Sequence, residues 1–167
     1  MSEIATVADR LAAAVSLRES GREEQAKDLL LALCAESPDD PAVNLHCAWA
    51  HDKLGLEAEA VPFYERSLEL GLEGNDLEDA LLGLGSTYRT LGRYGESLAT
   101  LTRGVESFPE ARGMQVFRAM ALYNTGHAKE ACETLLTLLA DTTSDETISR
   151  YRSAIATYAA DLDRTWS

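Results

Sequence analysis

The chain has 167 residues, of which 46% are hydrophobic, which is enough for one compact domain or one short repeat array with a real core. Its formal net charge of −13 argues against sequence-independent binding to nucleic-acid phosphates and against binding to anionic membrane surfaces. We therefore expect neither nucleic acid nor a membrane as the partner. The acidity favours solubility, with attraction of a basic partner as the alternative.

The N-terminal residues lack the basic start and apolar core of a signal peptide, and no apolar run approaches the roughly 20 residues of a membrane span. The three cysteines, Cys34, Cys47 and Cys132, are widely spaced and odd in number, as expected for ordinary buried thiols in a reducing compartment. We therefore expect a cytoplasmic protein. The excess of arginine over lysine weakly favours a GC-rich bacterial genome.

Glycines in polar turn contexts recur along the chain at Gly21, Gly55, Gly92 and Gly126, with gaps of 34, 37 and 34 residues. Glycine adopts a positive φ without steric cost, so each of these positions is expected to end one helix and allow the next to begin. Each period is thus predicted to be a helix, a turn and a helix. The predicted repeats cover residues 7–40, 41–77, 78–111 and 112–144.

Small residues occupy two further columns of this alignment. Seven residues before each turn glycine the chain has a small residue: Ala14, Ala48, Gly85 and Ala119. Five residues after each turn glycine it again has a small residue: Ala26, Ala60, Ser97 and Ala131. Small side chains on both sides of a turn allow two antiparallel helices to approach closely. Gly85 is therefore expected where a side chain would force its helix pair apart, although glycine costs about 1 kcal/mol relative to alanine inside a helix.

The last predicted element is one helix over residues 145–163, with Ser144 or Asp145 as its N-cap. Its apolar residues are spaced by three and four and form one stripe: Ile148, Tyr151, Ile155, Tyr158 and Leu162. A repeat array must end in an element with a polar outer side, because its last core face is otherwise exposed. We expect this helix to cap the array.

Three irregularities interrupt the repeats. The connection 71–78 carries three extra residues, and Asn75 or Asp76 is expected to cap the helix that follows. Pro62 lies about two turns into its helix and predicts a slight bend rather than a break. Arg118 falls in a column that is otherwise small or apolar, which predicts a rotation or a one-residue shift of the first helix of repeat four.

The third repeat carries Leu84-Gly85 and Tyr88, followed in register by Tyr94, Ser97, Leu101, Gly104 and Pro109. This pattern resembles the tetratricopeptide repeat, whose period is 34 residues, although no repeat here has the leading tryptophan of that family. The resemblance covers roughly residues 3–143. It implies an all-α fold, an α-solenoid with a right-handed superhelix, made of about four helix-turn-helix units and a C-terminal capping helix. We expect residues 1–167 to form a single domain of this kind.

The resemblance also implies a binding groove for an extended or helical peptide, lined by the first helix of each pair. Helical geometry places the residues two, three, six, nine and ten positions before each turn glycine on one side. From this face we expect the following partner-binding residues: Leu11, Val15, Arg18, Leu45, His46, Trp49, Lys53, Leu82, Gly83, Arg89, Phe117, Met120 and Tyr123.

Two features of this face suggest how a partner is held. Gly83 is expected to leave a dent beside Trp49 that accepts one anchoring side chain. Arg18, Lys53 and Arg89 form a basic row that we expect to meet a partner carboxylate, since charge-assisted hydrogen bonds are stronger than neutral ones. Tryptophan and arginine are also the residue types that most often dominate interface energy.

The sequence contains no pattern that predicts catalysis, a cofactor or a metal site. Gly83-Leu-Gly85 begins like a dinucleotide fingerprint, but Tyr88 replaces the third glycine. His46 and His51 are five residues apart on one predicted helix, which is a poor spacing for joint metal ligation. We interpret His51 as a packing residue and His127 as a surface residue. The chain is accordingly predicted not to be an enzyme.

Three functions remain open from the sequence. The first is an adaptor that binds a peptide or protein in the groove. The second is a structural scaffold that self-associates, for instance as a homodimer, through Trp49, Tyr158 or Trp166. The third is a chaperone for a translocated partner, because small acidic repeat chaperones of secretion systems are similar in size and charge, although they carry a longer helical segment before their first repeat.

Overall fold

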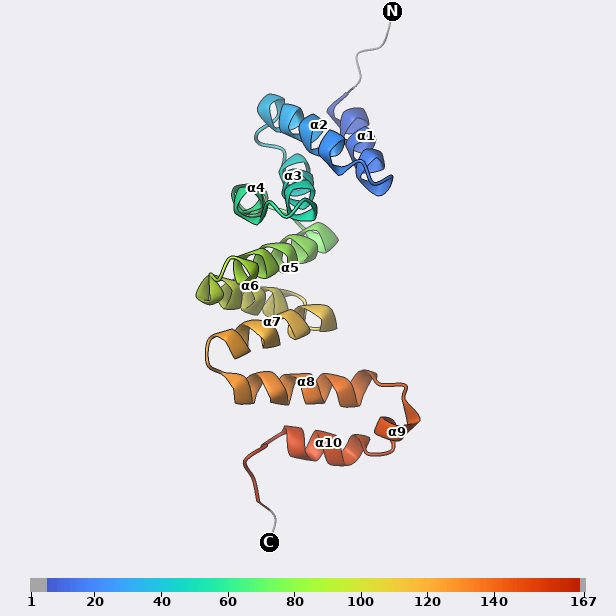
Figure 1. Cartoon of the computed structure of the whole chain (residues 1–167), viewed down its shortest axis with the longest axis vertical. Coiled ribbons are helices and arrows are strands. Elements are labelled where there is room, and N and C mark those ends of the chain that lie inside the picture. The colour runs from blue at the N-terminus through green and yellow to red at the C-terminus, as the bar shows by residue number, and fades with distance from the viewer. Residues whose placement is uncertain (1–5, 166–167) are drawn as a thin grey trace, which may run out of the picture. The chain divides into compact units, whose positions relative to one another are not determined.

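A computed structural model describes residues 6–165 of the chain, and these residues contain ten α-helices and no strand (Figure 1). The helices in chain order are α1 (Val7–Glu19), α2 (Glu23–Glu36), α3 (Pro41–Lys53), α4 (Glu57–Glu69), α5 (Gly74–Thr90), α6 (Tyr94–Ser107), α7 (Arg112–Asn124), α8 (Ala128–Thr142), α9 (Glu146–Ser149) and α10 (Arg152–Ala159). The prediction of an all-α fold built from paired helices is confirmed. Trp166, one of the residues considered for self-association, lies outside the described residues.

The turn glycines have the backbone conformation that the sequence predicts. Gly21, Gly55, Gly92 and Gly126 all have positive φ, between 73° and 86°. Each follows the end of its helix by two residues. In three of the turns the residue after the glycine donates its N–H to a carbonyl five residues back, for example from Arg22 to Leu17 at 2.9 Å. This bonding pattern satisfies carbonyls at the helix end and needs a left-handed residue at the glycine position.

The two columns of small residues are buried at all eight positions. The alanines Ala14, Ala26, Ala48 and Ala60 are completely inaccessible to solvent. Burial at these positions is what the sequence predicts for residues that separate closely packed antiparallel helices.

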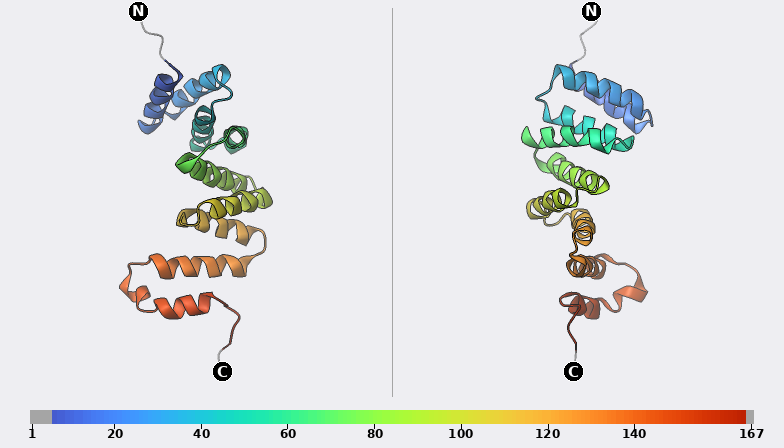
Figure 2. Two further views of the ribbon diagram at one scale, coloured as in Figure 1. Left: turned by 180° about the vertical axis from the view of Figure 1, so that it is seen from behind. Right: turned by 60° about the vertical axis from the view of Figure 1, so that its left-hand side comes forward.

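The described chain divides into two compact units, with the boundary between Gly92 and Arg93. Unit 1 contains α1–α5 and unit 2 contains α6–α10, so the predicted third repeat, 78–111, contributes one helix to each. In unit 1, successive helices pack on one another from α1 to α5. In unit 2, α6 packs on α7, α7 on α8, and α8 on α10; Figure 2 shows α8 and α10 side by side in both views. A single domain over residues 1–167 remains a prediction.

The C-terminal element differs from the predicted helix over 145–163. It consists of two short helices, α9 and α10, because the backbone N–H of Tyr151 bonds three residues back to Ile148, at 2.9 Å, and ends the α-helical ladder. Thr147, Ile148 and Ser149 are weak helix formers, which favours such an interruption. Asp145 is the N-cap as predicted, with its carboxylate accepting from the Thr147 N–H at 2.8 Å.

The predicted apolar stripe of this element is not a buried face. Tyr151, Tyr158 and Leu162 are exposed, whereas Ala159 is buried where α10 lies against α8. A small residue, rather than an aromatic stripe, therefore makes the close contact between these helices.

The predicted N-cap of α5 is also wrong. The helix begins at Gly74, before Asn75 and Asp76, and its N-cap residue Glu73 makes no side-chain capping bond. The positive φ of Gly71 and Gly74 takes the chain through the longer connection, so the helix starts earlier than the side chains suggest.

Arg118 does not shift its helix. Ala119 is buried like its counterparts Ala14, Ala48 and Gly85, so the register of α7 is the regular one. The half-buried Arg118 side chain instead reaches the neighbouring helices, donating from Nη2 to Glu130 at 2.8 Å and from Nε to Thr102 at 3.2 Å. Pro62 lies within α4 without breaking it, as predicted, while the bend stays a prediction.

Candidate functional site

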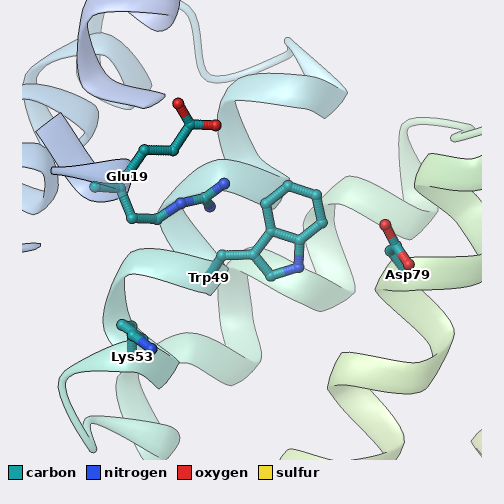
Figure 3. A pocket seen from close by; sticks show the side chains of 5 residues that line it. Glu19, Trp49, Lys53 and Asp79 are labelled. Atoms are coloured by element: carbon teal, nitrogen blue, oxygen red, sulfur yellow. The ribbon is translucent and has the colours of Figure 1, made fainter. Parts of the chain in front are cut away.

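A hollow of about 490 Å³ opens on unit 1, where α1, α3 and α5 present their predicted inner face. It is lined by Arg18, Glu19, Trp49, Lys53 and Asp79. Figure 3 shows the Trp49 indole between Glu19 on α1 and Asp79 on α5, with Lys53 one turn further along α3. Of the residues predicted for the groove, Arg18, Trp49 and Lys53 line this hollow.

Trp49 is held in position by two neighbours. The guanidinium carbon of Arg18 lies 5.0 Å from the centre of the indole ring, a cation–π arrangement. The His46 imidazole meets the same indole edge-on, with ring centres 4.8 Å apart and an interplanar angle of 88°. The indole is half-buried, so one part of it is fixed by packing and the rest faces the hollow.

His46 is a neutral histidine at neutral pH. Burial, followed by the nearby Arg18 charge, lowers its pKa from 6.5 to about 4. Its Nδ1 atom is buried and has no hydrogen-bond partner among the described residues. A charged imidazole at this place would lie close to a guanidinium in a partly desolvated site, which explains the direction of the shift.

The three residues of the basic row differ in their exposure and in their contacts. Lys53 is exposed at the rim of the hollow, whereas Arg18 is half-buried and already engaged with Trp49. Arg89 on α5 is half-buried, and its buried Nε has no partner within the described chain. Glu19 and Asp79 place two carboxylates beside these cations. The hollow thus presents both signs of charge around an aromatic floor.

Asp79 was missed by the sequence analysis, although a signal for it exists. It precedes Leu82 and Gly83 by three and four residues and therefore shares their helical face. The predicted face began at Leu82, whereas α5 runs for 17 residues from Gly74. The same helical face continues one turn back from Leu82 to Asp79, which lines the hollow.

Gly83 does not form the predicted dent. A Cβ placed at this glycine would lie 2.5 Å from the Tyr64 hydroxyl oxygen and 2.7 Å from the neighbouring ring carbon. The space left by the missing side chain is therefore filled by the phenol of Tyr64 from α4. Gly83 is therefore a position of close helix packing, and it leaves no space for a ligand side chain.

Leu45 is likewise not a groove residue. It is 1% exposed and belongs to the apolar core shared by α3, α4 and α5. Leu11 is half-buried and packs against the core cluster of α1, α2 and α3, while Val15 and Leu82 are also half-buried. These apolar positions support the helices that carry the hollow and do not line it.

A buried polar network fixes α3 against its neighbours directly beneath this face. The Asp52 carboxylate accepts from the Tyr64 hydroxyl at 2.7 Å and from the Thr87 hydroxyl at 2.8 Å. Burial raises the pKa of Asp52, an effect that the two hydrogen bonds partly oppose. Asp52 lies between Trp49 and Lys53 in sequence, so the network holds the helix that presents both.

The remaining predicted groove residues lie on α7 in unit 2. Tyr123 and Met120 are exposed, at 68% and 36%, and Phe117 is half-buried. They form an apolar face of their own unit.

The histidines outside the hollow behave as the sequence analysis expects. His51 is buried, bonds through Nδ1 to the Cys47 carbonyl at 2.7 Å, and stacks on Phe63. His127 is exposed. Across residues 6–165, no three His, Cys, Asp or Glu side chains gather closely enough to hold a metal ion.

A model of the tetratrico peptide repeat family matches residues 41–162, most of the chain. The chain belongs to the tetratricopeptide repeat family. Proteins of this repeat family act in general by binding peptides or other proteins, and they are in general not enzymes. No curated protein matches the sequence. Within the described residues, no helix is long and apolar enough to cross a membrane.

Solved structures of this tetratricopeptide repeat fold are similar over almost the whole chain. YrrB, a TPR protein with an unusual peptide-binding site, has a TM-score of 0.74 and 19% identity, over 95% of this chain and 79% of its own. MamA has a TM-score of 0.72 and 14% identity, over 97% and 79%. A chain of the APC/C hetero-tetramer Cut9-Hcn1 has a TM-score of 0.73 and 17% identity, over 94% of this chain and 30% of its own. At these identities the likeness establishes the fold.

Proposed function

We propose that this tetratricopeptide repeat chain is a non-enzymatic adaptor that binds a peptide or protein segment at the hollow of unit 1. The observation that carries the proposal is the Trp49 indole, which is fixed by Arg18 and His46 and faces an open space of about 490 Å³. A rigid aromatic side chain that is already ordered loses little entropy when a ligand covers it. Such anchors supply a large part of the energy of many interfaces.

The charges around Trp49 suggest the chemistry of the bound segment. Lys53 is exposed at the rim of the hollow, so its ammonium group can donate to a carboxylate of the segment. An apolar or aromatic side chain of the segment would cover the indole. We therefore propose a ligand with one apolar anchor and an acidic group close to it.

The test uses the fluorescence of Trp49. Trp166→Phe leaves Trp49 as the sole tryptophan, because the chain has two. Peptides selected from a library on the immobilised chain are titrated into this variant, and saturable binding with a change in Trp49 emission is expected. Trp49→Ala should weaken the same peptides at least about tenfold, measured by calorimetry. Leu31→Ala, which removes an exposed side chain of α2 in the same unit, is the matched control.

The charge part of the proposal has its own variant. Lys53→Ala should lower affinity for acidic peptides by about tenfold and leave neutral analogues unaffected. Equal binding of acidic and neutral peptides by all variants would contradict it. Binding that survives Trp49→Ala unchanged would contradict the adaptor site as a whole.

Self-association is the second candidate, and the exposed apolar side chains of unit 2 favour it. Met120 and Tyr123 on α7 and Leu135 and Leu139 on α8 are exposed. A mass that rises with concentration in light scattering, and that Met120→Ser with Tyr123→Ser abolishes, would favour a homodimer or scaffold. A secretion chaperone, the cytoplasmic location and the exclusion of nucleic acid and membrane partners stay predictions from composition.

A further inference from the structure

Two cysteines of the core of unit 1 lie in direct contact. Cys34 on α2 and Cys47 on α3 are both buried, and their sulfur atoms are 2.9 Å apart. A disulfide bond has a length of about 2.05 Å, so the sulfurs need to approach by roughly another 0.9 Å. The contact joins the second helix of repeat one to the first helix of repeat two.

We propose that Cys34 and Cys47 form an oxidisable pair, which a hydroperoxide converts into a disulfide between α2 and α3. The proposal goes beyond the binding function, because neither sulfur lines the hollow around Trp49. It assigns a chemical role to two of the three cysteines of the chain, and it leaves Cys132, which is exposed on α8, outside the reaction.

The surroundings of the two sulfurs differ, and this difference indicates which cysteine reacts first with the oxidant. Cys34 is 9% exposed and Cys47 is completely buried, so a small oxidant reaches Cys34 first. When Cys34 is a thiolate, a hydrogen bond from the Cys47 thiol lowers the pKa of Cys34, while the same contact together with burial raises the pKa of Cys47. Thiolates are the nucleophiles in cysteine oxidation. Cys34 is accordingly the attacking sulfur and Cys47 the resolving one.

The reaction balances in two steps. The Cys34 thiolate attacks one oxygen of hydrogen peroxide, the O–O bond breaks, Cys34 becomes a sulfenic acid, and the released hydroxide takes up a proton to leave as water. The Cys47 sulfur then attacks the Cys34 sulfur, the S–O bond breaks, the S–S bond forms, and a second water leaves with the Cys47 proton. The two thiols are oxidised by two electrons and the peroxide is reduced to two molecules of water.

The bond would stabilise unit 1 without changing its helices. It closes a loop of 13 residues that contains the α2–α3 turn, and such a cross-link restricts the unfolded chain. We expect the oxidised chain to unfold at a midpoint about 5 to 10 °C higher than the reduced chain, and a dithiol reductant to reverse the shift.

The experiment treats the full chain in a Cys132→Ser background with stoichiometric hydrogen peroxide, followed by alkylation and mass spectrometry. The expected product is a monomer that is lighter by two hydrogen atoms and carries no alkyl group. Cleavage after glutamate separates the two cysteines, because Glu36 lies between them, so the disulfide appears as a cross-linked peptide pair. Since no variant of the pair is needed for this measurement, a folding defect of Cys47→Ser does not affect it.

The matched controls make the outcome decisive. The wild-type chain should give the same internal cross-link, while Cys47→Ser should stop at an oxidised Cys34 or react with a second chain. Any of three results would overturn the proposal: both thiols still alkylated after the peroxide is consumed, Cys34 carrying two added oxygen atoms with Cys47 free, or a wild-type disulfide that involves Cys132.

Discussion

Among the described residues, unit 1 leaves two large apolar side chains exposed, Leu31 and Leu91, whereas unit 2 leaves eight exposed. Tyr64, Leu30, Leu33, Leu45 and Leu81 are among the fully buried side chains of unit 1. The exposed large apolar side chains of the described residues lie mainly in unit 2: Tyr94, Met120, Tyr123, Leu135, Leu139, Tyr151, Tyr158 and Leu162. Unit 1 also has the internal hydrogen-bond network of Asp52.

This difference in the exposure of apolar side chains suggests that the two units are suited to different kinds of binding. A tightly packed unit with a fixed indole over an open hollow is suited to receive a flexible segment, because its side of the interface is already ordered. A unit whose apolar side chains remain exposed is suited to pack against another folded surface. The repeat pattern alone does not distinguish the two, since both units keep the same turns and the same small residues.

The largest expected difference in stability between the units comes from replacing one glycine by alanine in each of them. Gly83→Ala in unit 1 should lower the free energy of unfolding by about 2 to 3 kcal/mol, because the new Cβ meets the rigid ring of Tyr64 at 2.5 to 2.8 Å. Gly104→Ala in unit 2 should cost about 1 kcal/mol or less, since its neighbour at 2.7 Å is the flexible Met114 side chain. Both are measured by chemical denaturation.

Gly95→Ala and Gly113→Ala are the controls for this comparison, because a Cβ at either position meets nothing within 4 Å. Both should leave stability unchanged or raise it slightly, through the higher helix propensity of alanine. A Gly83→Ala chain as stable as these controls would show that Tyr64 is free to move. That result would contradict the claim that unit 1 is more tightly packed at Gly83 than unit 2 is at Gly104.

The next effect concerns the hydroxyl groups of two tyrosines. Tyr64→Phe removes the donor to the Asp52 carboxylate and should destabilise the chain by about 1.5 to 2 kcal/mol, since a hydrogen bond to a charged group in a buried place is lost. Tyr123→Phe, at an exposed position of unit 2, should change stability by less than about 0.5 kcal/mol. Thermal or urea unfolding measures both changes in stability. Equal changes for the two variants would contradict the claim that the Asp52 network stabilises unit 1.

The pH dependence of stability should contain a contribution from His46 in unit 1. The folded-state pKa of about 4 lies below the ordinary 6.5, so between these values the unfolded chain binds more protons. The contribution of His46 is therefore fully present above pH 6.5 and is lost as the pH falls towards 4. After allowance for screening by solvent we expect about 1 kcal/mol. His46→Gln should flatten this part of the curve, measured by urea unfolding at a series of pH values between 4 and 7.

The smallest effect is expected for the exposed leucines of α8. Leu135→Ser and Leu139→Ser should change the stability of the monomer by less than about 0.5 kcal/mol each, because neither side chain is buried. If unit 2 packs against a second copy, the same variants should lower the mass measured at high concentration. A large loss of stability in a chain that remains monomeric would indicate that these side chains belong to the core of unit 2.

Much of the candidate site was visible in the sequence, since helical spacing alone places Arg18, Trp49 and Lys53 on one face. The same spacing could not show that Leu45 turns into the core or that Tyr64 fills the space at Gly83. Those outcomes depend on the angle between α3, α4 and α5, which no local pattern encodes. Asp79 was missed for a different reason, because the inner face was followed only as far as ten residues before Gly92, at Leu82.

The sequence by itself determined the paired helices, their turns and their close-packed columns, because glycine at a positive φ and small residues at fixed offsets are local requirements that only a few residue types meet. Tertiary structure alone decided which side chains of the inner face stay accessible, that Tyr64 fills the space at Gly83, and that Cys34 meets Cys47. Each of these depends on contacts between residues of different helices, and the free energy of such contacts is set by geometry that arises only when the helices pack.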